Sequence, residues 1–115
     1  MSKTRQELVH QALRELGVLA EGQPVSAEDY SSVNRHVDGL LDELRDRDVV
    51  FVADVELTEE RFFLPLAMVL ADRSKSVFGR SGDPALRADA ERAEGLLYAM
   101  TQDGPDFSIQ EGQYF

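Results

Sequence analysis

Apolar residues recur every three or four positions in four separate stretches of the chain, the spacing of one face of an α-helix. The first stretch follows Thr4 and Glu7, which are spaced as a capping box that satisfies free backbone N–H groups at a helix start. It is followed by Gly17, which suits the left-handed stop of a helix. The pattern therefore predicts a first helix over residues 4–16.

Longer apolar stripes predict three further helices. One continuous stripe, with polar residues on the opposite side, predicts a second helix over residues 26–46. The third helix is expected over residues 59–79, opened by Thr58 and followed by a tight turn. An aspartate followed by a proline is a strong start signal, and it opens a fourth helix over residues 83–102. The short connection predicts that the third and fourth helices pack antiparallel.

Pro65 lies inside the third predicted helix, where it removes one backbone hydrogen bond and crowds the preceding turn. Two interpretations are open from the sequence. Either the helix kinks at Pro65, or its regular part begins near Phe62.

Residues 49–55 are rich in β-branched side chains and too few for a separate helix, so they are predicted to form an extended segment or a short strand. A single strand needs a hairpin partner or a neighbouring subunit for its backbone groups. Residues 103–115 lack helical periodicity and begin with a Gly-Pro break. The predicted fold is thus all-α: a four-helix bundle with a short extended segment between helices two and three and an extended C-terminal tail.

The length of 115 residues suits one domain, divided here into a helical domain (1–102) and a docking tail (103–115). A chain of this size buries only about two-thirds of its unfolded surface, which makes it marginal alone. With no apolar signal core and no run of about 18 apolar residues, we expect a soluble protein made in the cytosol, without a membrane partner.

Catalytic and metal chemistry is not indicated. The chain has no cysteine, which excludes disulfides, thiolate chemistry and cysteine-ligated zinc. Its two histidines, His10 and His36, fall on polar faces of different predicted helices, where solvated side chains are far commoner than metal ligands. No glycine-rich phosphate loop or nucleophile motif is present. We expect no enzyme, no cofactor and no metal site.

Charge is unevenly distributed along the chain, whose net charge is −10. Residues 21–60 carry three basic and twelve acidic side chains, whereas residues 61–80 carry four basic and one acidic. The acidic balance argues against a protein that grips DNA phosphates. It suits association between copies, with the acidic segment of one meeting the basic segment of the next. An ordinary solvated acidic surface is the alternative.

The tail is the candidate partner-binding segment. Phe107 and Ile109 alternate with polar residues, and Tyr114 and Phe115 follow. Burying one such side chain is worth about 1.5–3 kcal/mol, so exposure of all four is costly. An extended segment can also add its backbone to a neighbour's sheet edge. The alternative is a tail that folds back on its own helices.

The pattern of small and large apolar residues resembles the head-to-tail adaptor proteins of tailed bacteriophages, also called connector, head-completion or tail accessory proteins. The resemblance covers about residues 5–100. It is carried by Ala12-Leu13-x-x-Leu16-Gly17, by Leu40, Leu41 and Leu44, and by Leu66-Ala67, Leu70-Ala71 and Phe78-Gly79.

This resemblance implies a structural virion protein at the head–tail junction, made in the host cytoplasm. Members form an oligomeric ring, commonly a dodecamer, between the portal protein and the next tail or stopper component. DNA passes through without specific binding. The C-terminal segment, here holding Phe107, Ile109, Tyr114 and Phe115, would reach the portal or a neighbouring subunit. Phage-derived gene transfer particles use the same class. The alternative function is a soluble acidic regulatory or DNA-mimic interaction module.

Overall fold

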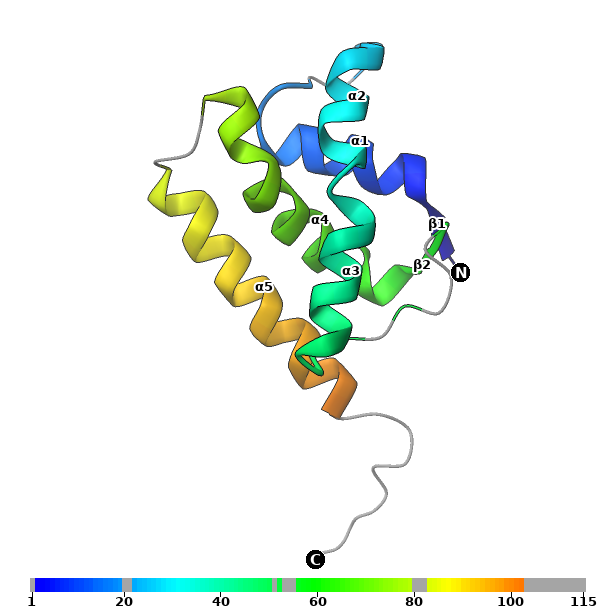
Figure 1. Cartoon of the computed structure of the whole chain (residues 1–115), viewed down its shortest axis with the longest axis vertical. Coiled ribbons are helices and arrows are strands. Elements are labelled where there is room, and N and C mark those ends of the chain that lie inside the picture. Colours follow the sequence, from blue (N-terminus) through cyan, green and yellow to red (C-terminus); the bar gives the residue numbers. More distant parts are fainter. Residues whose placement is uncertain (1, 20–21, 51, 53–55, 80–82, 103–115) are drawn as a thin grey trace, which may run out of the picture.

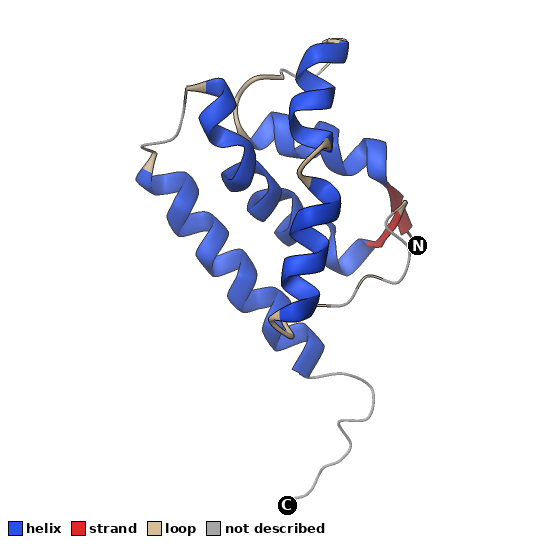
Figure 2. Ribbon diagram, viewed as in Figure 1, coloured by secondary structure: helices blue, strands red, loops and turns tan. Residues whose placement is uncertain are grey.

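The computed structural model describes residues 2–19, 22–50, 52, 56–79 and 83–102. These residues are mainly helical, as expected for the all-α class, with one small two-stranded sheet (Figure 2). In chain order the elements are β1 (Ser2–Thr4), α1 (Arg5–Glu15), α2 (Ala27–Asn34), α3 (Val37–Asp46), β2 (Leu57–Glu59), α4 (Glu60–Ser74), the 3-10 helix η1 (Lys75–Phe78) and α5 (Pro84–Gln102).

Helix α4 forms the centre of the molecule and packs against α1, α2, α3 and α5. Helices α4 and α5 run side by side in opposite directions, as the short connection predicts (Figure 1). Apolar side chains from every α-helix meet around α4. The largest fully buried ones include Leu8, Leu13, Leu16, Val33, Leu44, Leu66, Leu70 and Leu97.

The predicted signals at both ends of α1 are confirmed. The Thr4 backbone N–H donates to Glu7 Oε1 at 2.8 Å, and the Glu7 N–H donates to Thr4 Oγ1 at 3.1 Å, which completes the capping box. Gly17 adopts a left-handed conformation with φ of 77°. The next residue, Val18, then donates its N–H to the Leu13 carbonyl at 3.0 Å, so free carbonyls at the helix end are satisfied.

The second predicted helix, over residues 26–46, is wrong as one continuous element, because the structure divides it into α2 and α3 at Arg35 and His36. In an unbroken helix the Asn34 carbonyl would accept the amide of Asp38. Here Arg5 Nη2 donates to that carbonyl at 3.3 Å, while Arg5 Nε donates to Asn34 Oδ1 at 2.7 Å. The contact with α1, distant in sequence, thus occupies the backbone group at which α2 ends.

Residues 49–55 are predicted as an extended segment or short strand, and the structure shows no strand at the described positions 49, 50 and 52. Asp48 takes a left-handed φ of 57°, and the Val49 N–H then donates to the Leu44 carbonyl at 2.8 Å. Val49 and Val50 therefore serve as a buried stop for α3, while residues 51 and 53–55 lie outside the described residues. The actual strands are β1 and β2, which pair antiparallel with Lys3 opposite Thr58.

Helix α4 begins at Glu60 and continues through Pro65. The alternative in which the regular helix begins only near Phe62 is therefore wrong. Pro65 removes only the bond that its amide would have given to the Arg61 carbonyl. The N-cap is Glu59, without a side-chain hydrogen bond, so Thr58 does not have the opening role predicted for it. The last turn of the predicted element tightens into η1, and Gly79 ends it with φ of 73°, as expected.

Candidate interaction surface

The predicted partner-binding residues Phe107, Ile109, Tyr114 and Phe115 all belong to the segment 103–115, which lies outside the described residues. Their role therefore stays a prediction. The same holds for the division of the chain into a helical domain and a tail. The described residues do, however, present a surface that the sequence interpretation missed.

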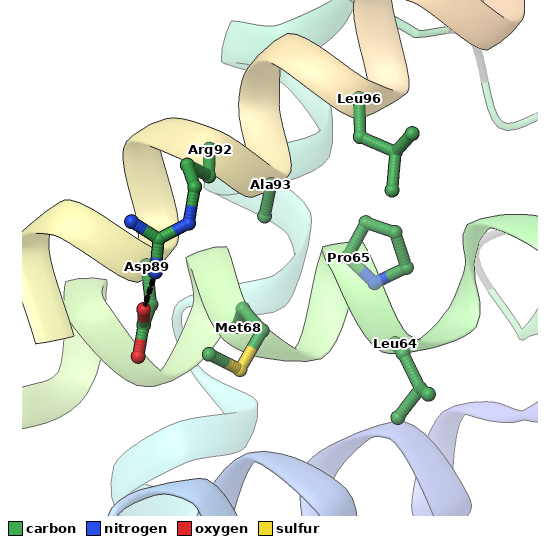
Figure 3. A pocket seen from close by; sticks show the side chains of 7 residues that line it. All are labelled: Leu64, Pro65, Met68, Asp89, Arg92, Ala93 and Leu96. Atoms are coloured by element: carbon green, nitrogen blue, oxygen red, sulfur yellow. Dashed lines mark hydrogen bonds and ion pairs between the residues drawn. The ribbon is translucent and has the colours of Figure 1, made fainter.

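This surface is an apolar groove between α4 and α5, with a volume of about 550 Å³ (Figure 3). Leu96 of α5 points toward Pro65 of α4 across the groove, and Asp89 and Arg92 form an ion pair at one end. We call this feature the α4–α5 groove. Its lining residues are Leu64, Pro65, Met68, Asp89, Arg92, Ala93 and Leu96.

Two large apolar side chains stand exposed at the groove. Leu64 is 56% exposed and Leu96 is 51% exposed, whereas their helix neighbours Leu66 and Leu97 are fully buried. Met68 is half-buried between them and the core. These side chains make the α4–α5 groove the candidate contact surface among the described residues.

The sequence of α4 explains why the face exists. Every residue from Phe62 to Ala71 is apolar, so the helix is hydrophobic all round rather than along one stripe. A helix of this composition is normally covered on every side. The other helices of the chain cover most of α4 but leave Leu64 in solvent. This uninterrupted apolar run was the signal in the sequence that could have indicated the surface.

A second hollow lies between α1 and α2. The His10 ring meets the Tyr30 ring edge-to-face with centroids 6.0 Å apart, and Ser26 beside them caps α2 by accepting the Asp29 N–H at 3.1 Å. These side chains of the hollow already contact other residues of the chain, and the contacts join α1 to α2 and cap α2. We therefore do not treat this hollow as a candidate binding site.

The other histidine, His36, lies at the junction of α2 and α3. Burial and the charges of Arg35 and Arg73 lower the pKa of His36, which favours its neutral form. Among the described residues, no group of three His, Cys, Asp or Glu side chains could hold a metal ion. Within the same residues, no helix is long and apolar enough to cross a membrane.

An ion-pair network fastens α3 to α4 and α5. Arg73 of α4 donates to Glu43 of α3 at 2.6 Å, and Arg47 bridges Glu43 and Glu94 of α5 at 3.1 and 2.8 Å. The Arg73 hydrogen bond is the main reason why the pKa of Glu43 is lowered. The network therefore links α3 to both α4 and α5.

The basic residues of the 61–80 segment pair largely within the chain. Arg61 pairs with Glu59 and Arg73 with Glu43, while Lys75 contacts the buried Asp72 at 2.6 Å. The alternation of charge along the sequence therefore serves contacts inside one molecule at these three positions.

A comparison with protein-family models, curated proteins and solved structures finds no match for this chain.

Proposed function

We propose that this protein is a non-enzymatic structural subunit, a head-to-tail adaptor that forms a ring between the portal and the tail of a tailed phage or gene transfer particle. In this proposal α2 and α3 act as two halves of one rod. The proposal then counts this rod, α1, α4 and α5 as the four members of the predicted bundle. It assigns residues 103–115 the role of a docking tail.

The observation that carries the proposal is the α4–α5 groove, an apolar surface that the described part of the chain leaves uncovered. Leu64 and Leu96 are each about half exposed, so covering both stabilises one contact by roughly 2 kcal/mol. In a ring the same contact repeats at every subunit, and the repeated contacts reinforce one another. In a protein that stays monomeric, the α4–α5 groove would remain exposed and would not stabilise any contact.

The acidic residues of α3 also favour an adaptor over a DNA mimic. A mimic needs rows of free carboxylates that imitate phosphates. Each acid of α3 instead forms an ion pair within the chain, although most stay largely exposed: Asp38 with Arg5, Asp42 and Asp46 with Arg45, and Glu43 with Arg47 and Arg73. An acidic but internally paired surface suits a channel wall that must not hold passing DNA.

The test is retention on immobilised portal rings from the particle that encodes the protein. We expect the unaltered protein to be retained, and the double variant Leu64→Gln, Leu96→Gln to be retained roughly 30-fold more weakly, as a loss of about 2 kcal/mol implies. Val77→Gln is the matched control, because Val77 is 44% exposed and does not line the groove. Absence of retention would contradict the adaptor function, and equal retention of the double variant would remove the groove as its support.

A further inference from the structure

A basic cleft lies where β1 and α1 meet the first turns of α4, and its volume is about 210 Å³. We call this feature the α1 cleft. Its lining residues are Lys3, Glu7, His10, Gln11, Arg14 and Phe63. None of them lines the α4–α5 groove, so the α1 cleft can bind a ligand independently of the adaptor contact.

The cleft gathers basic side chains that the rest of the chain leaves unpaired. Among the described residues, Lys3, Arg14 and Arg35 form no ion pair with a carboxylate, whereas the other Lys and Arg side chains do. Lys3 and Arg14 line the α1 cleft, and Arg35 does not. On a chain with a net charge of −10, unpaired cations in one cleft indicate a site for an anionic ligand.

The two cations come from backbone positions far apart along α1. Lys3 belongs to β1, and its ammonium lies 5.6 Å from the centre of the Phe63 ring. Arg14 lies in the last turn of α1, where its Nη1 donates to Gln11 Oε1 at 3.5 Å. Helix α1 begins at Arg5, nine residues before Arg14, so the helical rise separates the two positions by about 13 Å.

Glu7 is the acidic side chain of the cleft. Its Oε1 accepts the Thr4 N–H at 2.8 Å, and this hydrogen bond, together with the charge of Lys3, lowers the pKa of Glu7. The carboxylate is therefore ionised at neutral pH, and it lies between Lys3 and Arg14 in the sequence. It repels a ligand with closely spaced negative charges but leaves room for two carboxylates that are set apart.

We propose that the α1 cleft binds a short acidic segment of a partner protein through two carboxylates four residues apart. In an extended chain such residues lie on the same side and about 13 Å from each other, which matches the separation of the cationic positions. One carboxylate pairs with Lys3 and the other with Arg14, while the Phe63 ring contacts apolar atoms of the segment. A nucleic acid fits less well, because its many phosphates would also meet the acidic remainder of the chain.

The test is an NMR titration of isotope-labelled protein at low ionic strength, where surface charges are least screened. The probe is a five-residue peptide with blocked ends and a glutamate at its first and last positions, and the control peptide has glutamine at both. We expect the glutamate peptide to shift the signals of His10, Gln11 and Phe63, and the glutamine peptide to leave them unchanged. Equal shifts with both peptides, or shifts with neither, would overturn the inference.

Variants of single charges locate the contact. Lys3→Gln and Arg14→Gln should each weaken binding about fivefold, the effect of losing one exposed ion pair. Glu7→Gln should instead tighten binding about twofold, because it removes a repelling charge while glutamine still completes the capping box. Arg35→Gln is the matched control, since it removes an unpaired charge outside the cleft and should leave the affinity unchanged. Equal losses for Arg35→Gln and Arg14→Gln would overturn the inference, because net charge alone would then attract the peptide.

Phosphate ligands are tested in the same way. Inorganic phosphate and a single-stranded oligonucleotide should shift the cleft signals only at higher concentrations than the glutamate peptide does. Shifts at lower concentrations would assign the α1 cleft to phosphate groups and overturn the choice of an acidic protein segment. Retention on portal rings measures the adaptor function separately, since it depends on the α4–α5 groove.

Discussion

Replacing Thr58 by valine should stabilise the protein. Thr58 lies in β2 and is 1% exposed, and its hydroxyl has no hydrogen-bond partner among the described residues. A buried polar group without a partner costs about 1–3 kcal/mol, and valine has nearly the same shape and an equal preference for strands. We expect the free energy of unfolding to rise by about 1 kcal/mol, which corresponds to a melting temperature higher by roughly 4 °C.

Thermal and urea unfolding followed by circular dichroism would measure this change. Thr4→Val is the matched control in the partner strand, because the Thr4 hydroxyl accepts the Glu7 N–H and caps α1. That substitution should lower the free energy of unfolding by about 1 kcal/mol, the typical loss of an N-cap. A Thr58→Val protein that is no more stable than the unaltered one would refute the reasoning, since it would mean that the hydroxyl is satisfied.

Further predictions concern local backbone, charge and the tail. Asp48→Gly should stabilise the protein by about 0.5–1 kcal/mol in urea unfolding, because glycine adopts the left-handed φ of 57° without strain, and Asp48→Ala should not. Gly39→Ala in α3 should add a similar amount, since a Cβ there meets nothing within 4 Å; a loss of stability would show that the helix needs this glycine. The lowered pKa of Glu43 means that its pairing stabilises the fold above about pH 4.5, the ordinary value, and that this contribution is lost as the pH falls through the lower folded value. Glu43→Gln should therefore destabilise at pH 7 and flatten the acid part of the stability profile, and an unchanged profile would contradict the role of the Arg73 pair. Deleting residues 104–115 should leave helicity and melting temperature nearly intact while abolishing assembly on the portal, and unfolding of the shortened protein would assign the tail to its own core.

The helix ends could be predicted because their causes are local. Thr4 with Glu7, Gly17, and Asp83 before Pro84 each act on backbone groups within a few residues. The Asp83 carboxylate, for example, accepts the N–H groups of Ala85 and Leu86 at 3.0 and 3.3 Å. Such interactions depend only on spacing along the chain.

The break between α2 and α3 could not be predicted, because its cause is distant in sequence. No proline or glycine lies at residues 35 and 36. The helix ends where Arg5, 29 residues away, takes the Asn34 carbonyl. Val49 and Val50 form no strand for a related reason. Their backbone amides donate to the Leu44 carbonyl at the end of α3, and their side chains are buried. These contacts outweigh the preference of valine for strands.

Only one part of the candidate site, the apolar segment near the C-terminus, could be predicted from the sequence. The apolar alternation of Phe107 and Ile109 predicts a docking segment, but it does not say where that segment binds. The α4–α5 groove could be found only from the arrangement of the helices, which leaves Leu64 of α4 exposed. The periodicity of apolar residues identifies the buried face of a helix only when the other faces are polar. In α4 all residues from 62 to 71 are apolar, so the sequence does not show which side is left uncovered.

The most direct measurement of the central claim is the native mass of portal rings after incubation with the protein. A head-to-tail adaptor adds one copy per portal subunit, so a twelve-subunit portal should gain mass in increments of 12.9 kDa and reach a single plateau at twelve copies. Intermediate species should be scarce if neighbouring bound copies contact one another in the ring. Portal rings whose mass stays unchanged, with the protein remaining as free monomer at concentrations well above the ring concentration, would contradict the account.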